Sequence, residues 1–253
     1  MSIQRTEAII LKTIPYGETS KILTTFTRNL GKVNLLARGA RDVKSKYGGS
    51  LELFTHVSVI FYERTERDLQ YVSDVTVIDP FLQIHDHLDR TYTALAIIEM
   101  CNRLIHGNED NFHLFDLLLQ TLQGLNHTDK RPMNGFLYFM LHVAERSGFR
   151  IETEVCDHCQ DMLAHKELRF DETHGRVVCE SCPAALRNVS GNELSKESLG
   201  ILRQIARSRG NGIYNIHMSE RAGTEIYHLL LRHLQYHMEE LKSLNALSFL
   251  KLA

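Results

Sequence analysis

The chain has 253 residues, of which 43% are hydrophobic and 24% are charged, and its formal net charge is −2. This composition is typical of a folded protein with enough apolar side chains for more than one domain. No apolar run approaches the roughly 18 residues that a membrane helix needs, and the N-terminal segment lacks the apolar core of a signal peptide. We therefore expect a cytoplasmic protein without a membrane partner.

The charge is distributed unevenly along the chain. Residues 1–48 contain nine basic and three acidic residues, a net charge of +6, so the rest of the chain carries −8. A basic segment in an otherwise acidic chain indicates a polyanionic partner for that segment. The alternative interpretation is a solvated basic rim that binds nothing.

The first third of the chain has the period-two alternation that is typical of β-strands. The segments that show it are 9–11, 20–27, 32–38, 51–62 and 68–79. Five short strands in about 75 residues suit a small closed barrel. The oligonucleotide-binding (OB) barrel is the common five-stranded closure, and its grooves suit nucleic acid.

The pattern changes to a helical period of 3.6 at Asp79-Pro80. Apolar residues at helical spacing predict helices over 84–107, 111–125, 132–147, 195–208 and 221–244. We therefore predict a multidomain α+β protein with a five-stranded OB-fold barrel followed by an all-helical domain. The predicted bounds are 1–80 for the barrel domain, 81–253 for the helical domain and 152–190 for an insert within it.

The insert carries the motif with the clearest chemistry, two Cys-x2-Cys pairs that are separated by 19 residues: Cys156, Cys159, Cys179 and Cys182. Two tight turns can aim four thiolates at one ion and complete a tetrahedron. Residues 167–170 and 176–178 between the pairs are typical of a hairpin, so we predict a zinc-ribbon-like module. Four thiolates leave no open position for a substrate, so one structural Zn²⁺ is expected, with a redox pair as the alternative.

Motifs that would indicate an enzyme are absent from the sequence. It contains no phosphate-binding or dinucleotide-binding glycine motif, no serine-hydrolase motif and no zinc-protease motif. His233 and His237 have i, i+4 spacing and could bind a metal, but no third ligand accompanies them, which favours a polar helix face. Cys101 lies on an apolar helical face and is predicted to be buried. We therefore predict no catalytic residues and no small-molecule substrate.

Seven basic residues of the N-terminal segment are predicted to contact DNA phosphates: Lys21, Arg28, Lys32, Arg38, Arg41, Lys44 and Lys46. Strand alternation turns Lys32 and Arg38 away from the apolar face, and Gly39, Gly48 and Gly49 allow sharp turns. Point charges on one barrel face suit contact with a phosphate backbone, without base reading. Tyr47 is the predicted stacking platform for a base.

Residues 16–64, "YGETSKILTTFTRNLGKVNLLARGARDVKSKYGGSLELFTHVSVIFYER", resemble the N-terminal domain of the RecO family of DNA repair and recombination proteins. The order of a helical domain interrupted by a four-cysteine module also resembles that family. The resemblance implies a non-enzymatic recombination mediator that binds single- and double-stranded DNA and anneals strands. It further implies partnership with RecR in loading RecA, contact with the C-terminal tail of single-strand-binding protein (SSB), and a bacterial cytoplasm in which bound protein associates with the nucleoid.

A protein-interaction adaptor is the alternative function. In that interpretation the barrel and the zinc module bind protein, and the basic loop is incidental. DNA affinity that depends on salt distinguishes the two functions, because phosphate contacts release counterions.

Overall fold

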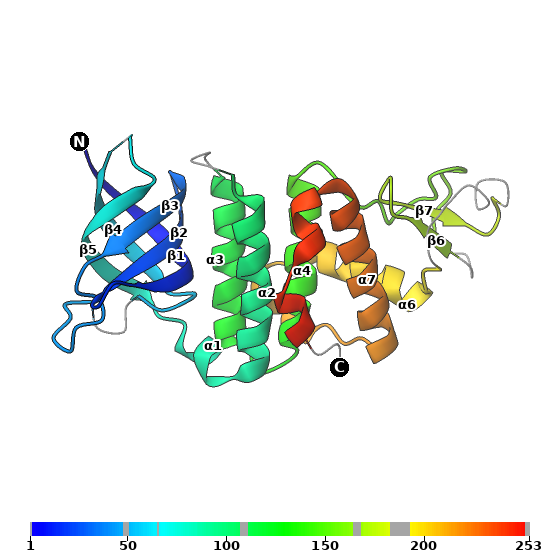
Figure 1. The fold of residues 1–253 in the computed structure, drawn as a ribbon. Coiled ribbons are helices and arrows are strands. Elements are labelled where there is room, and N and C mark those ends of the chain that lie inside the picture. The colour runs from blue at the N-terminus through cyan, green and yellow to red at the C-terminus, as the bar shows by residue number, and fades with distance from the viewer. Residues whose placement is uncertain are drawn as a thin grey trace. The chain divides into compact units, whose positions relative to one another are not determined.

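The structure is a computed structural model that describes residues 2–47, 51–64, 66–106, 111–163, 168–182 and 193–250. The chain divides into two compact units, Met1–His127 and Thr128–Ala253. Figure 1 shows the ribbon of both units. Among the described residues, no helix has the length and apolar character needed to cross a membrane.

Five strands of the first unit form a closed barrel, and they follow one another around it in the order β1-β2-β3-β5-β4. Neighbouring strands are antiparallel except β3 and β5, which run parallel. This five-stranded closure agrees with the predicted OB fold. The strands are β1 (Ser2–Tyr16), β2 (Ser20–Thr27), β3 (Gly31–Ala37), β4 (His56–Glu63) and β5 (Leu69–Asp79).

Alternate residues of these strands fill the barrel, as the period-two pattern predicts. Ile10, Leu23, Leu35 and Phe61 all belong to one buried cluster inside it. The predicted fourth strand was placed too early, because residues 51–54 form turns and the strand begins at His56. Phe54 has a positive φ of 68°, which a β-strand does not allow.

Three helices complete the first unit: α1 (Leu82–Asp86), α2 (Leu88–Leu104) and α3 (Phe112–His127). Helix α3 covers part of the outer barrel surface, where Phe115 packs edge-to-face against Phe26 of β2 at a centroid distance of 5.4 Å. The single helix predicted from residue 84 is broken at His87, which has an extended backbone. Cys101 of α2 is buried as predicted, and burial raises the pKa of its thiol.

The second unit is helical apart from its cysteine ribbon and is built around α4 (Pro132–Arg146). Phe136, Phe139 and Met140 of this helix are completely buried, which confirms its predicted central position. The predicted helix over 221–244 ends at His237, because the next residue is extended. The other helices among the described residues of this unit are α6 (Lys196–Arg207), η1 (Gly210–Asn215), α7 (Glu220–His237), η2 (Glu239–Ser243) and η3 (Ala246–Phe249).

A two-stranded hairpin between α4 and α6 forms the ribbon. Strands β6 (Leu168–Asp171) and β7 (Arg176–Cys179) are antiparallel, and Gly175 in the turn has a positive φ of 67°. Residues 164–167 and 183–192 of this region, and Gly48 and Gly49 of the predicted DNA site, lie outside the described residues.

Candidate nucleic-acid interface and metal centre

The four cysteines of the ribbon converge on one point. Their sulfur atoms all lie within 4.8 Å of one another. The Sγ–Sγ distances are 3.7 Å for Cys159–Cys179, 3.8 Å for Cys179–Cys182 and 4.0 Å for Cys156–Cys182. Four sulfurs at about 2.3 Å from a tetrahedral zinc ion would be about 3.8 Å apart. The cluster is therefore positioned to hold a metal ion of that size.

The local electrostatics also suit a cation. Burial by itself would raise the pKa of Cys156, but hydrogen bonds from backbone groups of Cys159, Cys179 and His158 lower it to about 6. Burial and the neighbouring thiols raise the pKa of Cys182 to about 12. Four thiols this close together cannot all ionise unless a positive ion compensates their charge.

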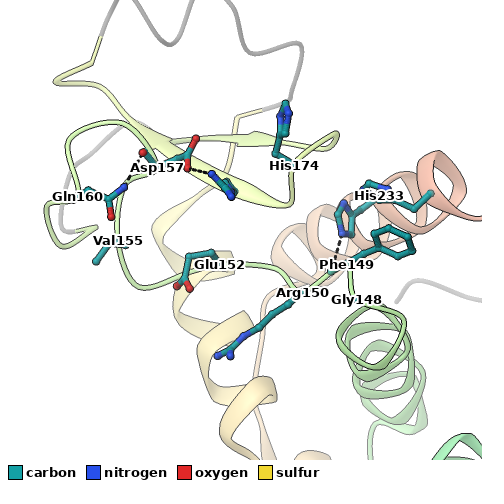
Figure 2. Close-up of a pocket in the computed structure, with 11 residues that line it drawn as sticks. Gly148, Phe149, Arg150, Glu152, Val155, Asp157, Gln160, His174 and His233 are labelled. Carbon is teal, nitrogen blue, oxygen red and sulfur yellow. Dashed lines mark hydrogen bonds and ion pairs between the residues drawn. The ribbon is translucent and has the colours of Figure 1, made fainter.

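His233 of α7 fastens the ribbon to the helices of the second unit. Its Nδ1 lies 2.7 Å from the Glu172 carbonyl oxygen. Its Nε2 lies 2.8 Å from the Phe149 carbonyl oxygen, a contact that Figure 2 shows. Both nitrogens of the His233 ring thus face backbone carbonyls, and the side chain is only 1% exposed. Among the described residues, the four cysteines are the group of three or more possible ligands that is positioned to hold a metal ion.

Figure 2 shows the pocket of about 470 Å³ beside this contact. Its wall includes both signs of charge, because Arg176 is ion-paired with Asp157 and Glu152 lies nearby. The ring of Phe149 stacks on His237 at a centroid distance of 4.1 Å. These mutual contacts make the pocket part of the packing between the ribbon and α7.

The four cations of residues 38–47, between β3 and β4, form what we call the basic loop: Arg38, Arg41, Lys44 and Lys46. All four are exposed, and no carboxylate of a described residue forms an ion pair with them. The Arg41 N–H donates to the Thr19 carbonyl at 2.7 Å, so the loop packs against the β1–β2 turn. The structure thus brings four of the seven predicted cations together.

Two other predicted cations are held by the helices of the first unit. The Arg28 guanidinium lies 3.0 Å from the Asp116 carboxylate of α3. Lys32 donates through Nζ to the Asn102 carbonyl of α2 at 2.7 Å. Burial lowers the pKa of Lys32. Lys32 points outward from the barrel, as predicted, but the side chains of Arg28 and Lys32 both reach a surface that helices cover.

The remaining predictions concern Lys21 and Tyr47. Lys21 is ion-paired with Glu52 at 2.9 Å. The prediction of Tyr47 as a stacking platform is wrong, because its side chain belongs to the barrel core and only 6% of it is exposed. The aromatic ring that lies beside the basic loop is that of Tyr71 in β5, with the Arg38 guanidinium 4.6 Å from its centroid.

Sequence reasoning also missed the β4–β5 turn, which contains Arg64 and Arg67. Both are exposed. The turn between strands 4 and 5 is a ligand-binding element of OB barrels, which is the signal that could have identified it. Its acidic neighbours Glu63, Glu66 and Asp68 hid this signal in the charge pattern.

The protein is a multidomain α+β protein with a closed OB barrel, a helical unit and a ribbon whose four cysteines are positioned to hold a metal ion. Residues 1–81 match the family described as recombination protein O N terminal, and residues 85–245 match recombination protein O C terminal. The chain belongs to the RecO family of DNA repair proteins.

Curated relatives carry the same family name over most of their length. The DNA repair protein RecO of Chloroherpeton thalassium is 26% identical over 245 residues, which is 94% of each chain. That of Chlorobium limicola is 30% identical over 195 residues, 74% of each chain. That of Salinibacter ruber is 34% identical over 147 residues, 58% of this chain and 56% of the relative.

Proposed function

We propose that this protein is a non-enzymatic recombination mediator that binds single- and double-stranded DNA without sequence specificity. The observation that supports this is the basic loop, whose four exposed cations lack carboxylate partners among the described residues. An unpaired surface cation can exchange its solvent contacts for a phosphate, and the released counterions favour binding. Arg38, Arg41, Lys44 and Lys46 are the phosphate contacts in this proposal, while Lys21, Arg28 and Lys32 serve contacts within the protein.

Annealing of complementary strands follows from the same surface. Cations that neutralise phosphates reduce the repulsion between two strands, and contacts limited to the backbone leave base edges free to pair. Family membership supports the finer steps: loading of RecA onto SSB-coated strands with RecR, contact with the SSB tail, and action in the bacterial cytoplasm at the nucleoid.

We assign one structural Zn²⁺ to the four cysteines of the ribbon. Sulfur spacing suits zinc, and a full set of four protein ligands leaves no position for water or substrate. When bound, the ion supplies folding free energy to a hairpin with little core of its own.

The test is the salt dependence of DNA affinity. Fluorescence anisotropy of labelled single-stranded DNA, measured at several salt concentrations, gives the slope of log K against log salt. Arg38→Ala, Arg41→Ala and Lys44→Ala together should reduce this slope by about 2, since each phosphate contact contributes about 0.7.

The matched control removes three exposed cations of the second unit by Lys130→Ala, Lys196→Ala and Arg209→Ala, with the same change of net charge. We expect this control to change the salt slope less than the triple substitution in the basic loop does. Equal slopes for the two triple variants would exclude the basic loop as the site, and salt-independent binding by the unaltered protein would favour the adaptor function.

A further inference from the structure

Two tyrosines occupy neighbouring positions on the outer surface of the barrel. Tyr62 of β4 is directly opposite Tyr71 of β5 in the strand register. The adjacent residues, Phe61 and Val72, are also paired and pack in the barrel core. Because side chains alternate between the two faces of a strand, both tyrosines face outward. Both are partly exposed.

The pair lies within a longer apolar row that crosses the barrel. Ile3 of β1 is opposite Tyr62, and Leu36 of β3 is aligned with Tyr71. Ile3 is 66% exposed, although it is a large aliphatic residue. Leu36 is only 6% exposed, so the members of this row that a ligand can reach are Ile3, Tyr62 and Tyr71, on three neighbouring strands.

Helix α3 of the first unit covers a different part of the outer surface. Phe115 of α3 contacts Phe26 and His56. His56 and Tyr62 are six residues apart on β4, which corresponds to about 20 Å along a strand. The tyrosine pair is therefore remote from the surface that α3 buries.

Two cations of the basic loop flank the pair. The Arg38 guanidinium lies 4.6 Å from the Tyr71 ring centroid. Lys46 donates through Nζ to the Ser73 carbonyl, two residues further along β5, at 2.7 Å. Positive charge and an aromatic face are thus placed side by side, which is the combination that sequence-tolerant single-strand binding requires.

The β4–β5 turn is held next to the same pair by a largely buried side chain. Gln70 accepts from the Arg64 N–H at 2.9 Å, and its amide donates to the Arg64 and Arg67 carbonyls. These bonds fix the turn at the end of the two strands that carry Tyr62 and Tyr71.

We propose that Tyr71 and Tyr62 form a stacking platform for unpaired bases, with Arg38 and Lys46 beside it to contact the flanking phosphates. This inference rests on the proposed DNA-binding function and adds a preference of the protein for single-stranded over double-stranded DNA. A base that stacks on Tyr71 displaces the Arg38 guanidinium from the ring toward a phosphate. Bases within a duplex present no free face, so the platform favours single strands.

The experiment uses the full chain and fluorescein-labelled oligothymidine of about 20 nucleotides, longer than the roughly 4–16 that one OB barrel covers. Tyr71→Ala should weaken single-strand binding about ten-fold, and Tyr71→Phe should retain the affinity because the ring remains. Tyr236→Ala, which removes a tyrosine that is 61% exposed on α7, is the control and should bind as the unaltered protein.

A second readout reports the contact itself. The chain has nine tyrosines and no tryptophan, so tyrosine emission is observable directly. Oligothymidine should quench part of this emission. The Tyr71→Phe protein should show less quenching, because it lacks the contribution of Tyr71, while it keeps its affinity. Duplex affinity and the salt slope should be unchanged in Tyr71→Ala, since the phosphate contacts remain.

The outcomes separate this proposal from the function on which it rests. Normal, salt-dependent single-strand binding by folded Tyr71→Ala and Tyr62→Ala proteins would overturn the platform and leave DNA binding intact. Equal losses of single-strand and duplex affinity in Tyr71→Ala would also overturn it. Absence of DNA binding by the unaltered protein would overturn both.

Discussion

Arg28, in the turn that follows β2, and Asp116 of α3 form an ion pair with an N–O distance of 3.0 Å, and the same guanidinium lies 4.9 Å from the Phe115 ring centroid. Only about a quarter of the Arg28 side chain is exposed. A partly buried cation with both a carboxylate and an aromatic partner contributes to packing. Arg28 therefore joins the barrel to its own helices.

This contact makes Arg28 and Arg41 a matched pair for separating packing from DNA binding. We expect Arg28→Ala to lower the free energy of unfolding by about 1–2 kcal/mol, because Asp116 loses its partner, with little change in the salt slope. Arg41→Ala should change the free energy of unfolding by less than about 0.5 kcal/mol and reduce the salt slope by about 0.7. Urea unfolding and DNA titration of each variant measure both quantities. A lower slope in Arg28→Ala than in Arg41→Ala would reverse these assignments.

The pair also shows what the sequence could and could not predict. Alternation along the strands correctly predicted the barrel and the outward direction of Lys32. It could not show that Asn102, 70 positions later in the chain, lies over that side chain. A side chain that points outward from a barrel is exposed only where no other element packs on it. Local sequence patterns do not show this, because the covering element can lie far along the chain. The cysteine cluster was predictable because its ligand spacing is local.

Alanine substitution should have opposite effects on the free energy of unfolding at two glycines that lie in helices. A Cβ on Gly135 of α4 would lie 2.7 Å from the hydroxyl oxygen of the buried Tyr214, whereas a Cβ on Gly200 of α6 would meet nothing within 4 Å. Alanine gains about 1 kcal/mol of helix propensity at either site. Overpacking costs about 1–3 kcal/mol in a filled core. We expect Gly200→Ala to stabilise by about 1 kcal/mol and Gly135→Ala to destabilise by about 1 kcal/mol.

Urea unfolding of the two glycine variants measures this difference. A Gly135→Ala protein as stable as Gly200→Ala would show that Tyr214 moves aside at little cost. The near-UV circular dichroism of Gly135→Ala should also change, because the tyrosine ring has to shift.

His56 should lower the free energy of unfolding when the pH falls. Burial lowers its pKa from the usual 6.5, and the neighbouring Glu7 offsets this only in part. The unfolded chain therefore binds the proton more readily, so the contribution of His56 is complete above about pH 6.5 and is lost as the pH falls toward the folded-state pKa. His56→Gln removes the titrating group and can keep a hydrogen bond to Glu7. The difference in unfolding free energy between pH 7.5 and pH 5.5 should be smaller in this variant, and an unchanged difference would contradict the argument.

Removal of one ribbon thiol should affect folding more than DNA binding. Cys159→Ser replaces one of the four converging sulfurs with a hydroxyl oxygen, which is a much weaker zinc ligand. Because a small hairpin depends on its metal for stability, we expect less than one zinc per chain and a Tm lowered by on the order of 5 °C. Single-strand affinity should change by less than about two-fold, since the basic loop is in the other unit.

The control for this thiol is Cys101→Ala, which removes a buried cysteine outside the cluster and should keep one zinc per chain. A chelator should lower the Tm of this control and of the unaltered protein toward that of Cys159→Ser, and should not affect Cys159→Ser itself. Metal content by colorimetric release and Tm by circular dichroism measure the two effects. If Cys159→Ser lost its metal and kept the original Tm, the ion would not be structural, and the four thiols would need a different explanation such as redox chemistry.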